Sequence, residues 1–247
     1  MSKTLLLFDV DGTLTAPRLK VTEQMTSFLA QIRASGVKLA VVGGSDLGKI
    51  TEQLADDLPN LLGQFDYVFS ENGVIGFKAG EKIPSKTMLE EIGEELMQEI
   101  INFALKFIAE SDYPKKRGNF VEFRKGMLNL SPIGRSCTQE ERLEFVAYDA
   151  KAGLRKKFVE LLNEKFSSKG ISFAIGGQIS VDAFPTGWDK TLCLQHLVSE
   201  FDTIHFFGDR TAPGGNDHEI FEDARTNGHT VTGPEDTIAQ IKEVLKL

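Results

Sequence analysis

Two aspartates near the start of the chain have the types and spacing needed for phosphoryl chemistry. Residues 8–15 read Phe-Asp-Val-Asp-Gly-Thr-Leu-Thr, so Asp9 and Asp11 directly follow the apolar run of residues 4–8. A short run of β-prone residues ending in Asp and Gly predicts a buried strand and a turn. Alternation then points both carboxylates to one side. Because paired carboxylates repel each other and an incoming phosphate, they indicate bound Mg²⁺. One aspartate can attack phosphorus while the other exchanges a proton.

The same string has an ordinary alternative, because Asp-Gly is a common turn dipeptide. The complete string after a hydrophobic strand is far more specific than that dipeptide. It resembles the nucleophile motif of the haloacid dehalogenase superfamily. The resemblance implies that Asp9 is the nucleophile and Asp11 the acid/base.

Three further segments place polar groups after predicted strands or at a helix start: Gly44-Ser45, Lys190 and Asp209. In an open parallel sheet such positions meet at one edge. Ser45 could offer its hydroxyl and nearby N–H groups to a phosphate, Lys190 could add positive charge, and Asp209 could complete the Mg²⁺ ligands. Taken singly, the three residues could instead be a helix cap, a surface lysine and a turn residue. Their joint occurrence in this order favours the phosphate site.

Alternating helices and strands predict an α/β core with a Rossmann-like parallel sheet covered by helices on both faces. The predicted strands are 4–8, 37–42, 203–207 and a short one near Thr230. The predicted helices are 22–35, 46–58 ending at Pro59, 191–200, and a last one carrying Ile238, Ile241, Val244 and Leu245.

The pattern changes between Pro84 and Gly187, where helices and hairpins predict an inserted α+β cap domain with an antiparallel sheet. The predicted elements are a helix over 89–107, strands 120–124 and 127–131, helices 138–149 and 154–166, and strands 171–175 and 179–184. We therefore expect a catalytic core of 1–84 and 188–247, a cap of 85–187 for substrate specificity and dimerisation, and hinges near Ser85 and Gly187.

Composition excludes several classes of protein. The net charge of −8 argues against nucleic acid as a partner and leaves room only for a local basic pocket. No apolar run is long enough for a membrane span, and the first residues are too short for a signal peptide, so we expect a cytoplasmic protein. Cys137 and Cys193 suit a reducing compartment and predict no disulfide framework.

Several longer segments resemble the eukaryotic phosphomannomutase family, and the resemblance runs essentially from end to end. Residues 208–217 carry a four-residue insertion relative to the short Gly-Asp-x-x-Asn-Asp of many superfamily members. The other segments are 41–46, 131–136 and 176–182. The resemblance implies an isomerase that interconverts mannose 6-phosphate and mannose 1-phosphate through an aspartyl-phosphate enzyme and a hexose 1,6-bisphosphate. It also implies a bisphosphate activator, a homodimer through the caps and a role in GDP-mannose synthesis, with glucose phosphates as further possible substrates.

Arginines in the predicted cap suit a mutase, because a substrate held by its reacting phosphate needs a second anion clamp and guanidinium groups bind phosphate through two hydrogen bonds. A solvated basic surface or salt bridges within the cap are the alternative. The substrate contacts implied by the resemblance are Arg18, Gly44, Ser45, Arg124, Arg135, Arg142, Ser180, Asp182 and Lys190. The implied metal ligands are Asp9, Asp11 and Asp209, with a second cation loop at Phe221 (through its carbonyl), Asp223 and Thr226.

Two other functions share most of these residues. A sugar phosphatase of the same superfamily would need the same aspartates but would pass the phosphoryl group to water. A non-catalytic sugar-phosphate sensor is disfavoured because both aspartates are present.

Overall fold

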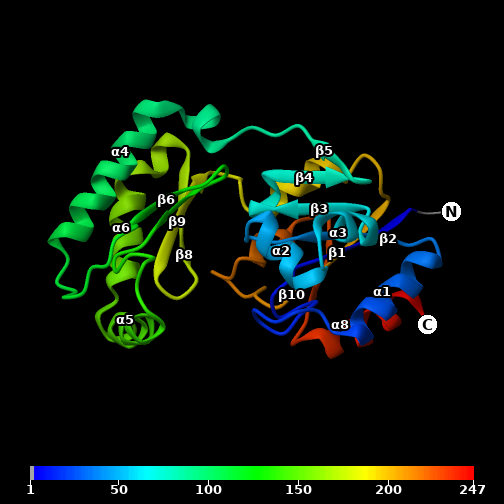
Figure 1. Cartoon of the computed structure of the whole chain (residues 1–247). Coiled ribbons are helices and arrows are strands. Elements are labelled where there is room, and N and C mark those ends of the chain that lie inside the picture. Colours follow the sequence, from blue (N-terminus) through cyan, green and yellow to red (C-terminus); the bar gives the residue numbers. More distant parts are fainter. Residues whose placement is uncertain (1–2) are drawn as a thin grey trace. The chain divides into compact units, whose positions relative to one another are not determined.

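The computed structural model describes residues 3–247, so Met1 and Ser2, the first residues of the predicted core, lie outside it. The chain forms two compact units: Met1–Ser85 with Gly187–Leu247, and Lys86–Thr186. The first contains a mostly parallel sheet and the second a separate antiparallel sheet (Figure 1). The predicted α/β fold with an inserted α+β module is therefore confirmed.

The first unit is built on a seven-stranded sheet of order β11-β10-β1-β2-β3-β4-β5. Its strands are β1 (Thr4–Phe8), β2 (Lys38–Val42), β3 (Tyr67–Ser70), β4 (Ile75–Lys78), β5 (Glu81–Ile83), β10 (Thr203–Gly208) and β11 (Asn227–Thr230). The central strand β1 pairs in parallel with β10 and β2. The antiparallel strands β4 and β5 at one edge were not predicted.

Both faces of this sheet are covered, as predicted. Its helices are α1 (Glu23–Ala34), α2 (Leu47–Leu54), α3 (Leu58–Gln64), α7 (His218–Glu222) and α8 (Pro234–Leu245), with 3₁₀ segments η1 (Glu71–Gly73) and η3 (Lys190–His196). Alternation along β1 divides the core: Leu6 and Phe8 pack with the helices α1, α2, α3 and α8, while Leu5 and Leu7 pack with η3 and α7. Helices α1 and α8 lie side by side (Figure 1).

Two helices predicted for this unit differ from the structure in their bounds or helix type. The helix predicted over 46–58 ends at Leu54, and a second helix, α3, begins at Leu58. Pro59 lies in the first turn of α3, where the missing N–H needs no partner, and Asp57 caps that helix by accepting from Asn60 N at 2.8 Å. The helix predicted over 191–200 is the shorter 3₁₀ segment η3, capped by Asp189, whose carboxylate accepts from Thr191 N at 2.8 Å.

The second unit is a four-stranded antiparallel sheet of order β6-β7-β9-β8 with helices. Its elements are α4 (Met88–Glu110), β6 (Val121–Phe123), β7 (Leu128–Leu130), α5 (Gln139–Ala152), α6 (Leu154–Phe166), η2 (Ser167–Lys169), β8 (Ile171–Gly176) and β9 (Ser180–Pro185). Aromatic rings join α4 to α6, where Phe107 stacks on Phe158 with centroids 4.2 Å apart. We refer to Lys86–Thr186 as the cap unit and to the other unit as the core unit.

Truncating a buried side chain of the central strand β1 should lower the stability of the core unit measurably. Leu6 is fully buried, and Leu6→Ala removes methyl groups from a packed site, so we expect a loss of about 2–5 kcal/mol in unfolding free energy. The measurement is urea denaturation followed by circular dichroism. Leu19→Ala is the matched control, because Leu19 is 62% exposed and its truncation should change stability by less than about 0.5 kcal/mol. Equal shifts in the two variants would contradict the core assignment.

Candidate active site

Asp9 lies immediately after β1, where the sheet places it beside a buried lysine. Its backbone N donates to Phe207 O at 2.9 Å, which ties it to the end of the neighbouring strand β10. The Lys190 ammonium donates to Asp9 Oδ1 and, at 2.6 Å, to Asp217 Oδ1. All three side chains are almost fully buried. The two predicted residues Asp9 and Lys190 are therefore in direct contact.

Three carboxylates gather at this point. Asp9, Asp209 and Asp217 each offer an oxygen, and these oxygens lie within 4.8 Å of one another. Two glycines permit the approach: a Cβ on Gly12, whose φ is +81°, would stand 2.5 Å from Asp209 Oδ2, and a Cβ on Gly208 would stand 2.7 Å from Asp217 Oδ2. A side chain at either glycine would displace a carboxylate of this group.

The carboxylate group fits a hard divalent cation. Three carboxylates face one ammonium, so the group carries excess negative charge, and it offers only the oxygen ligands that Mg²⁺ prefers. Burial raises the pKa of Asp9 to about 7, although the Lys190 charge acts in the opposite direction. Burial and the charge of Asp217 also raise the pKa of Asp209. Burial is the main cause of both shifts, and the neighbouring carboxylate of Asp217 adds to each of them.

Asp11 has a different set of partners. Its carboxylate accepts from Arg18 N at 2.7 Å and from Gln53 Nε2 at 2.7 Å, and Lys49 Nζ lies 3.4 Å away. Burial alone would raise the pKa of Asp11, but these hydrogen bonds and the Lys49 charge together lower it below its usual value. Asp11 was a predicted metal ligand, yet its carboxylate is not in the group of three, where Asp217 takes part instead.

The predicted phosphate loop, Gly43–Ser45, follows β2 directly. Ser45 is not the helix cap of the ordinary alternative, because Asp46 caps α2 by accepting from Lys49 N at 3.0 Å. Lys49 Nζ donates to Ser45 Oγ at 3.2 Å as well as approaching Asp11. The half-buried Ser45 and Asp11 thus share a lysine that was not predicted.

A second polar network covers one face of the cap sheet. Cross-strand pairing sets Glu122 opposite Asn129 and Asn129 opposite Asp182, so the three side chains share that face. Asn129 Nδ2 donates to Ser180 Oγ at 2.8 Å and to Asp182 Oδ1 at 2.6 Å. Burial raises the pKa of Asp182 in spite of that hydrogen bond.

The two arginines of this network share one acidic partner. Arg124 Nε donates to Glu122 Oε1 at 3.0 Å, and Arg135 pairs with the other oxygen of the same carboxylate. Arg135 Nη1 also donates to Asn129 Oδ1 at 2.8 Å. Four predicted residues, Arg124, Arg135, Ser180 and Asp182, therefore lie in one network that also contains the unpredicted Glu122 and Asn129.

Arg142 is placed differently from the other predicted cap residues. It lies in the first turns of α5, and within residues 3–247 no hydrogen bond or ion pair joins its guanidinium to the Glu122 network. Arg18 lies in the nucleophile loop with a positive φ of 66° and reaches Asp11 through its backbone.

The segment predicted as a second cation loop is held by its own side chains. Arg225 donates from Nε and Nη2 to the two oxygens of Asp223 at 2.8 and 2.6 Å. Thr226 Oγ1 donates to Ile220 O at 2.5 Å and to Asp223 O at 3.1 Å. A cation bound by Asp223 would have to compete with the guanidinium of Arg225.

The residues that were not predicted had partial signals in the sequence. Asp217 ends the Gly208–Asp217 segment that carries the family resemblance, and Lys49 lies in the first turn of the helix predicted to follow Ser45. Glu122 and Arg124 are two apart along a strand and so share a face. Gln53 carried no signal, because its contact with Asp11 spans 42 residues.

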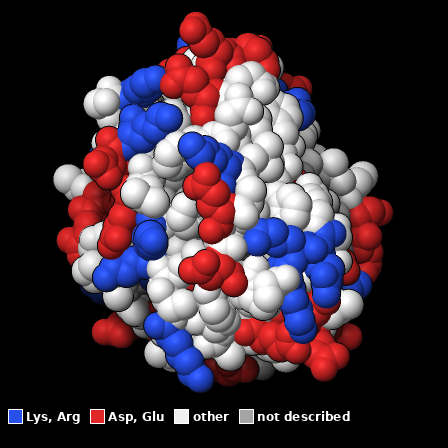
Figure 2. Space-filling model, turned by 90° about the vertical axis from the view of Figure 1, so that its left-hand side faces the viewer, with Lys and Arg blue, Asp and Glu red and all other residues white. Residues whose placement is uncertain are grey.

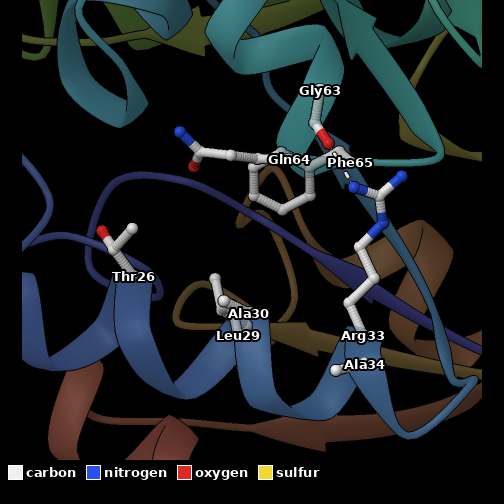
Figure 3. Close-up of a pocket in the computed structure, with 8 residues that line it drawn as sticks. All are labelled: Thr26, Leu29, Ala30, Arg33, Ala34, Gly63, Gln64 and Phe65. Carbon is white, nitrogen blue, oxygen red and sulfur yellow. Dashed lines mark hydrogen bonds between the residues drawn. The ribbon is translucent and has the colours of Figure 1, made fainter.

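A pocket elsewhere in the core unit is not part of this site. It has a volume of about 420 Å³ and lies between α1 and the end of α3, lined by Thr26, Leu29, Ala30, Arg33, Ala34, Gly63, Gln64 and Phe65 (Figure 3). Its Arg33 guanidinium already donates to Gly63 O and pairs with Asp66, and Thr26 Oγ1 donates to Thr22 O. None of the predicted site residues lines it.

On the face shown in Figure 2, basic side chains form small groups with acidic side chains around them. In the part of the chain that the structure covers, no helix is long and apolar enough to cross a membrane.

Solved structures share the fold at low sequence identity. The IMP-bound, N-terminally truncated IMP-nucleotidase of Plasmodium falciparum is 20% identical with a TM-score of 0.63, over 100% of this chain and 69% of that chain. A haloacid dehalogenase-like hydrolase from Bacteroides thetaiotaomicron is 14% identical with a TM-score of 0.64, over 98% of this chain and 99% of that one. Likeness at this level concerns the fold alone, and it agrees with the predicted α/β fold.

Closer relatives match almost the whole chain. A probable phosphomannomutase of Caenorhabditis elegans is 63% identical over 99% of this chain and 96% of that protein. Phosphomannomutase 1 of Homo sapiens is 53% identical over 98% and 92%, and the phosphomannomutase of Schizosaccharomyces pombe is 52% identical over 99% and 95%. A family model described as eukaryotic phosphomannomutase matches residues 25–247. The chain therefore belongs to the eukaryotic phosphomannomutase family.

Proposed function

We propose that this chain interconverts mannose 6-phosphate and mannose 1-phosphate through an aspartyl-phosphate enzyme and a hexose 1,6-bisphosphate. The observation that carries the proposal is the buried contact of Asp9 with Lys190 at the end of the central strand, in a chain of this family. Asp9 is the nucleophile. Lys190, Ser45 and Gly44 bind the oxygens of the reacting phosphoryl group, so that positioning and electrostatics supply most of the rate enhancement.

The family implies a metal cofactor, and the buried carboxylate group is compatible with one. We propose Mg²⁺, held by Asp9, Asp209 and Asp217, where it would neutralise charge on the group and on the phosphate. A second cation at Phe221, Asp223 and Thr226 remains a proposal, and its role there would be structural.

Asp11 acts as acid toward the leaving sugar oxygen and then as base toward the hydroxyl that accepts the phosphoryl group. Acid catalysis requires a proton on Asp11, whereas Gln53, Arg18 N and Lys49 stabilise its ionised form in the substrate-free structure. These donors must therefore weaken, or Lys49 must turn to the phosphate, before Asp11 can donate a proton.

The cap residues hold the phosphate that is not reacting. Arg124 and Arg135, with Arg18 and Arg142, supply the guanidinium groups, and Ser180 and Asp182 bind sugar hydroxyls. Glu122 keeps Arg124 and Arg135 in place without substrate, and a phosphate of greater charge then takes its position. In this proposal the cap unit sets substrate specificity, and the core unit performs the phosphoryl transfer.

Further parts of the proposal rest on the family and on composition. We propose a bisphosphate activator that primes Asp9, a homodimer formed through the cap units, a cytoplasmic location and a supply of mannose 1-phosphate to GDP-mannose synthesis. Glucose phosphates are possible additional substrates. A sugar phosphatase of the same superfamily is the second candidate, and it is less favoured because close relatives are named phosphomannomutases.

Phosphorus NMR separates the two candidates. With Mg²⁺ and a trace of hexose 1,6-bisphosphate, we expect the mannose 1-phosphate signal to be replaced by mannose 6-phosphate without stoichiometric inorganic phosphate. Asp9→Asn should abolish this conversion because an amide cannot form the aspartyl phosphate, and its circular dichroism spectrum should match the wild type. Release of one inorganic phosphate per sugar would identify a phosphatase, and full activity of Asp9→Asn would exclude Asp9 as the nucleophile.

Binding of Mg²⁺ should depend on pH in a defined direction. Because burial raises the pKa of Asp9 to about 7, Asp9 keeps its proton below pH 7 and must lose it when the metal binds. The affinity for Mg²⁺ should therefore rise as pH increases, by up to about tenfold per unit, and level off above pH 7. Calorimetry in two buffers of different ionisation enthalpy should detect proton release near pH 6 and little at pH 8. A constant affinity over this range would contradict the site.

The cap arginines should act on substrate affinity. Arg135→Ala removes charge-assisted hydrogen bonds to the distal phosphate, each worth about 1.5–3 kcal/mol, so we expect KM for mannose 1-phosphate to rise roughly 10- to 100-fold. Arg117→Ala is the matched control from the same unit, because Arg117 pairs with Glu141 outside the network. Steady-state kinetics of both variants provides the test. Unchanged KM in Arg135→Ala, or equal effects in the two variants, would remove Arg135 from the substrate site.

A further inference from the structure

The 3₁₀ segment η1 has an unusual backbone. Glu71, Asn72 and Gly73 are three successive residues with positive φ, at 50°, 60° and 101°. Side chains other than glycine rarely adopt this region, and such a conformation persists only where the surrounding structure requires it. The residues around η1 therefore hold it in this conformation.

This segment is hydrogen-bonded to both ends of the phosphate loop, Gly43–Ser45. Glu71 N donates to Ser45 O at 3.0 Å, and Asn72 N donates to Gly43 O at 3.0 Å. On its other side, a Cβ on Gly73 would stand 2.9 Å from Cys193 N in η3, the segment that begins with Lys190. The left-handed backbone is thus what allows one short turn to contact both phosphate-binding segments.

The side chain of Asn72 points to the phosphate loop. Its Oδ1 lies 3.1 Å from the position that a Cβ on Gly44 would take, and the residue is half-buried. Across residues 3–247, the carboxamide of Asn72 has no hydrogen-bond partner. A carboxamide carries two N–H donors, and rotation about its last bond brings them to the place of the oxygen. Donors beside Gly44 and Ser45 suit an anionic oxygen.

We propose that Asn72 is a further substrate-contacting residue, which donates from Nδ2 to an oxygen of the phosphoryl group bound at Ser45. The inference rests on the proposed function, because it assigns a contact within the same phosphoryl site. Asparagine meets two requirements there at once: it tolerates the left-handed backbone that η1 needs, and it presents a neutral donor that does not repel phosphate.

The variant Asn72→Gly separates the contribution of the Asn72 side chain from that of its backbone conformation. Asn72→Gly keeps the left-handed conformation without strain and removes only the carboxamide, so its thermal midpoint should equal or exceed that of the wild type. Its kcat for mannose 1-phosphate should fall about 10- to 100-fold, with a smaller change in KM, because a hydrogen bond to a charged group is lost from the transition state. Asn72→Asp should lose at least as much activity, because it places a negative charge beside the phosphate.

Two further variants complete the design. Ala79→Gly is the matched control, because Ala79 has a φ of 49° on an exposed turn of the same unit, and it should leave kcat unchanged. Asn72→Ala should lose as much activity as Asn72→Gly and have a lower thermal midpoint. Wild-type kcat in Asn72→Gly, or activity lost in Asn72→Ala and retained in Asn72→Gly, would overturn the proposal, because either result assigns Asn72 a backbone role only.

Calorimetry with inorganic phosphate and Mg²⁺ provides a readout that does not depend on mutase turnover. Asn72→Gly should bind phosphate about 10-fold more weakly than the wild type if the carboxamide contacts the anion. A wild-type protein that binds phosphate but does not isomerise mannose phosphates would refute the proposed function and leave the Asn72 assignment standing. Equal phosphate affinities in wild type and Asn72→Gly would refute the assignment alone.

Discussion

The buried ammonium of Lys190, held between the carboxylates of Asp9 and Asp217, is the interaction on which the rest of the site depends. Removing a charge from water costs several kcal/mol, so a lysine this deeply buried stays charged only with anionic partners close by. The two carboxylates supply them and raise the pKa of Lys190 despite its burial. Three chain segments, after β1, at the start of η3 and after β10, are thereby fixed together.

The three carboxylates of Asp9, Asp209 and Asp217 exceed the single positive charge of Lys190. One ammonium does not neutralise three carboxylates, so the substrate-free site favours a proton on Asp9 or a divalent cation. A phosphate adds further negative charge. The proposed nucleophile and the proposed cation therefore belong to one arrangement, in which Gly12 and Gly208 let Asp209 and Asp217 approach.

The cap unit also pairs opposite charges, in the more exposed network around Glu122. Glu122 balances Arg124 and Arg135 while their side chains remain 20% and 32% exposed, so the guanidinium groups are ordered and still accessible. Asn129 connects this pair to Ser180 and Asp182 through hydrogen bonds across the sheet. In the core unit the charges are buried and closely paired, whereas in the cap unit they are partly exposed and share the single carboxylate of Glu122.

The sequence by itself determined the fold class, the position of Asp9 after a buried central strand and the family to which the chain belongs. These properties depend on local patterns: apolar runs, turn residues and motifs within a few residues of one another. Even the antiparallel cap sheet followed from two hairpins of adjacent strands, because hairpin pairing is local.

Only the tertiary structure decided which polar groups meet. The contact of Lys190 with Asp9 spans 181 residues, and that of Gln53 with Asp11 spans 42. The 3₁₀ segment η3 also differs from the helix predicted over 191–200. Burial raises the pKa of Asp9, whereas hydrogen bonds and the Lys49 charge lower that of Asp11, although only one residue separates the two aspartates in the chain. Burial and pairing are properties of the folded surroundings, so no pattern of neighbouring residues encodes them alone.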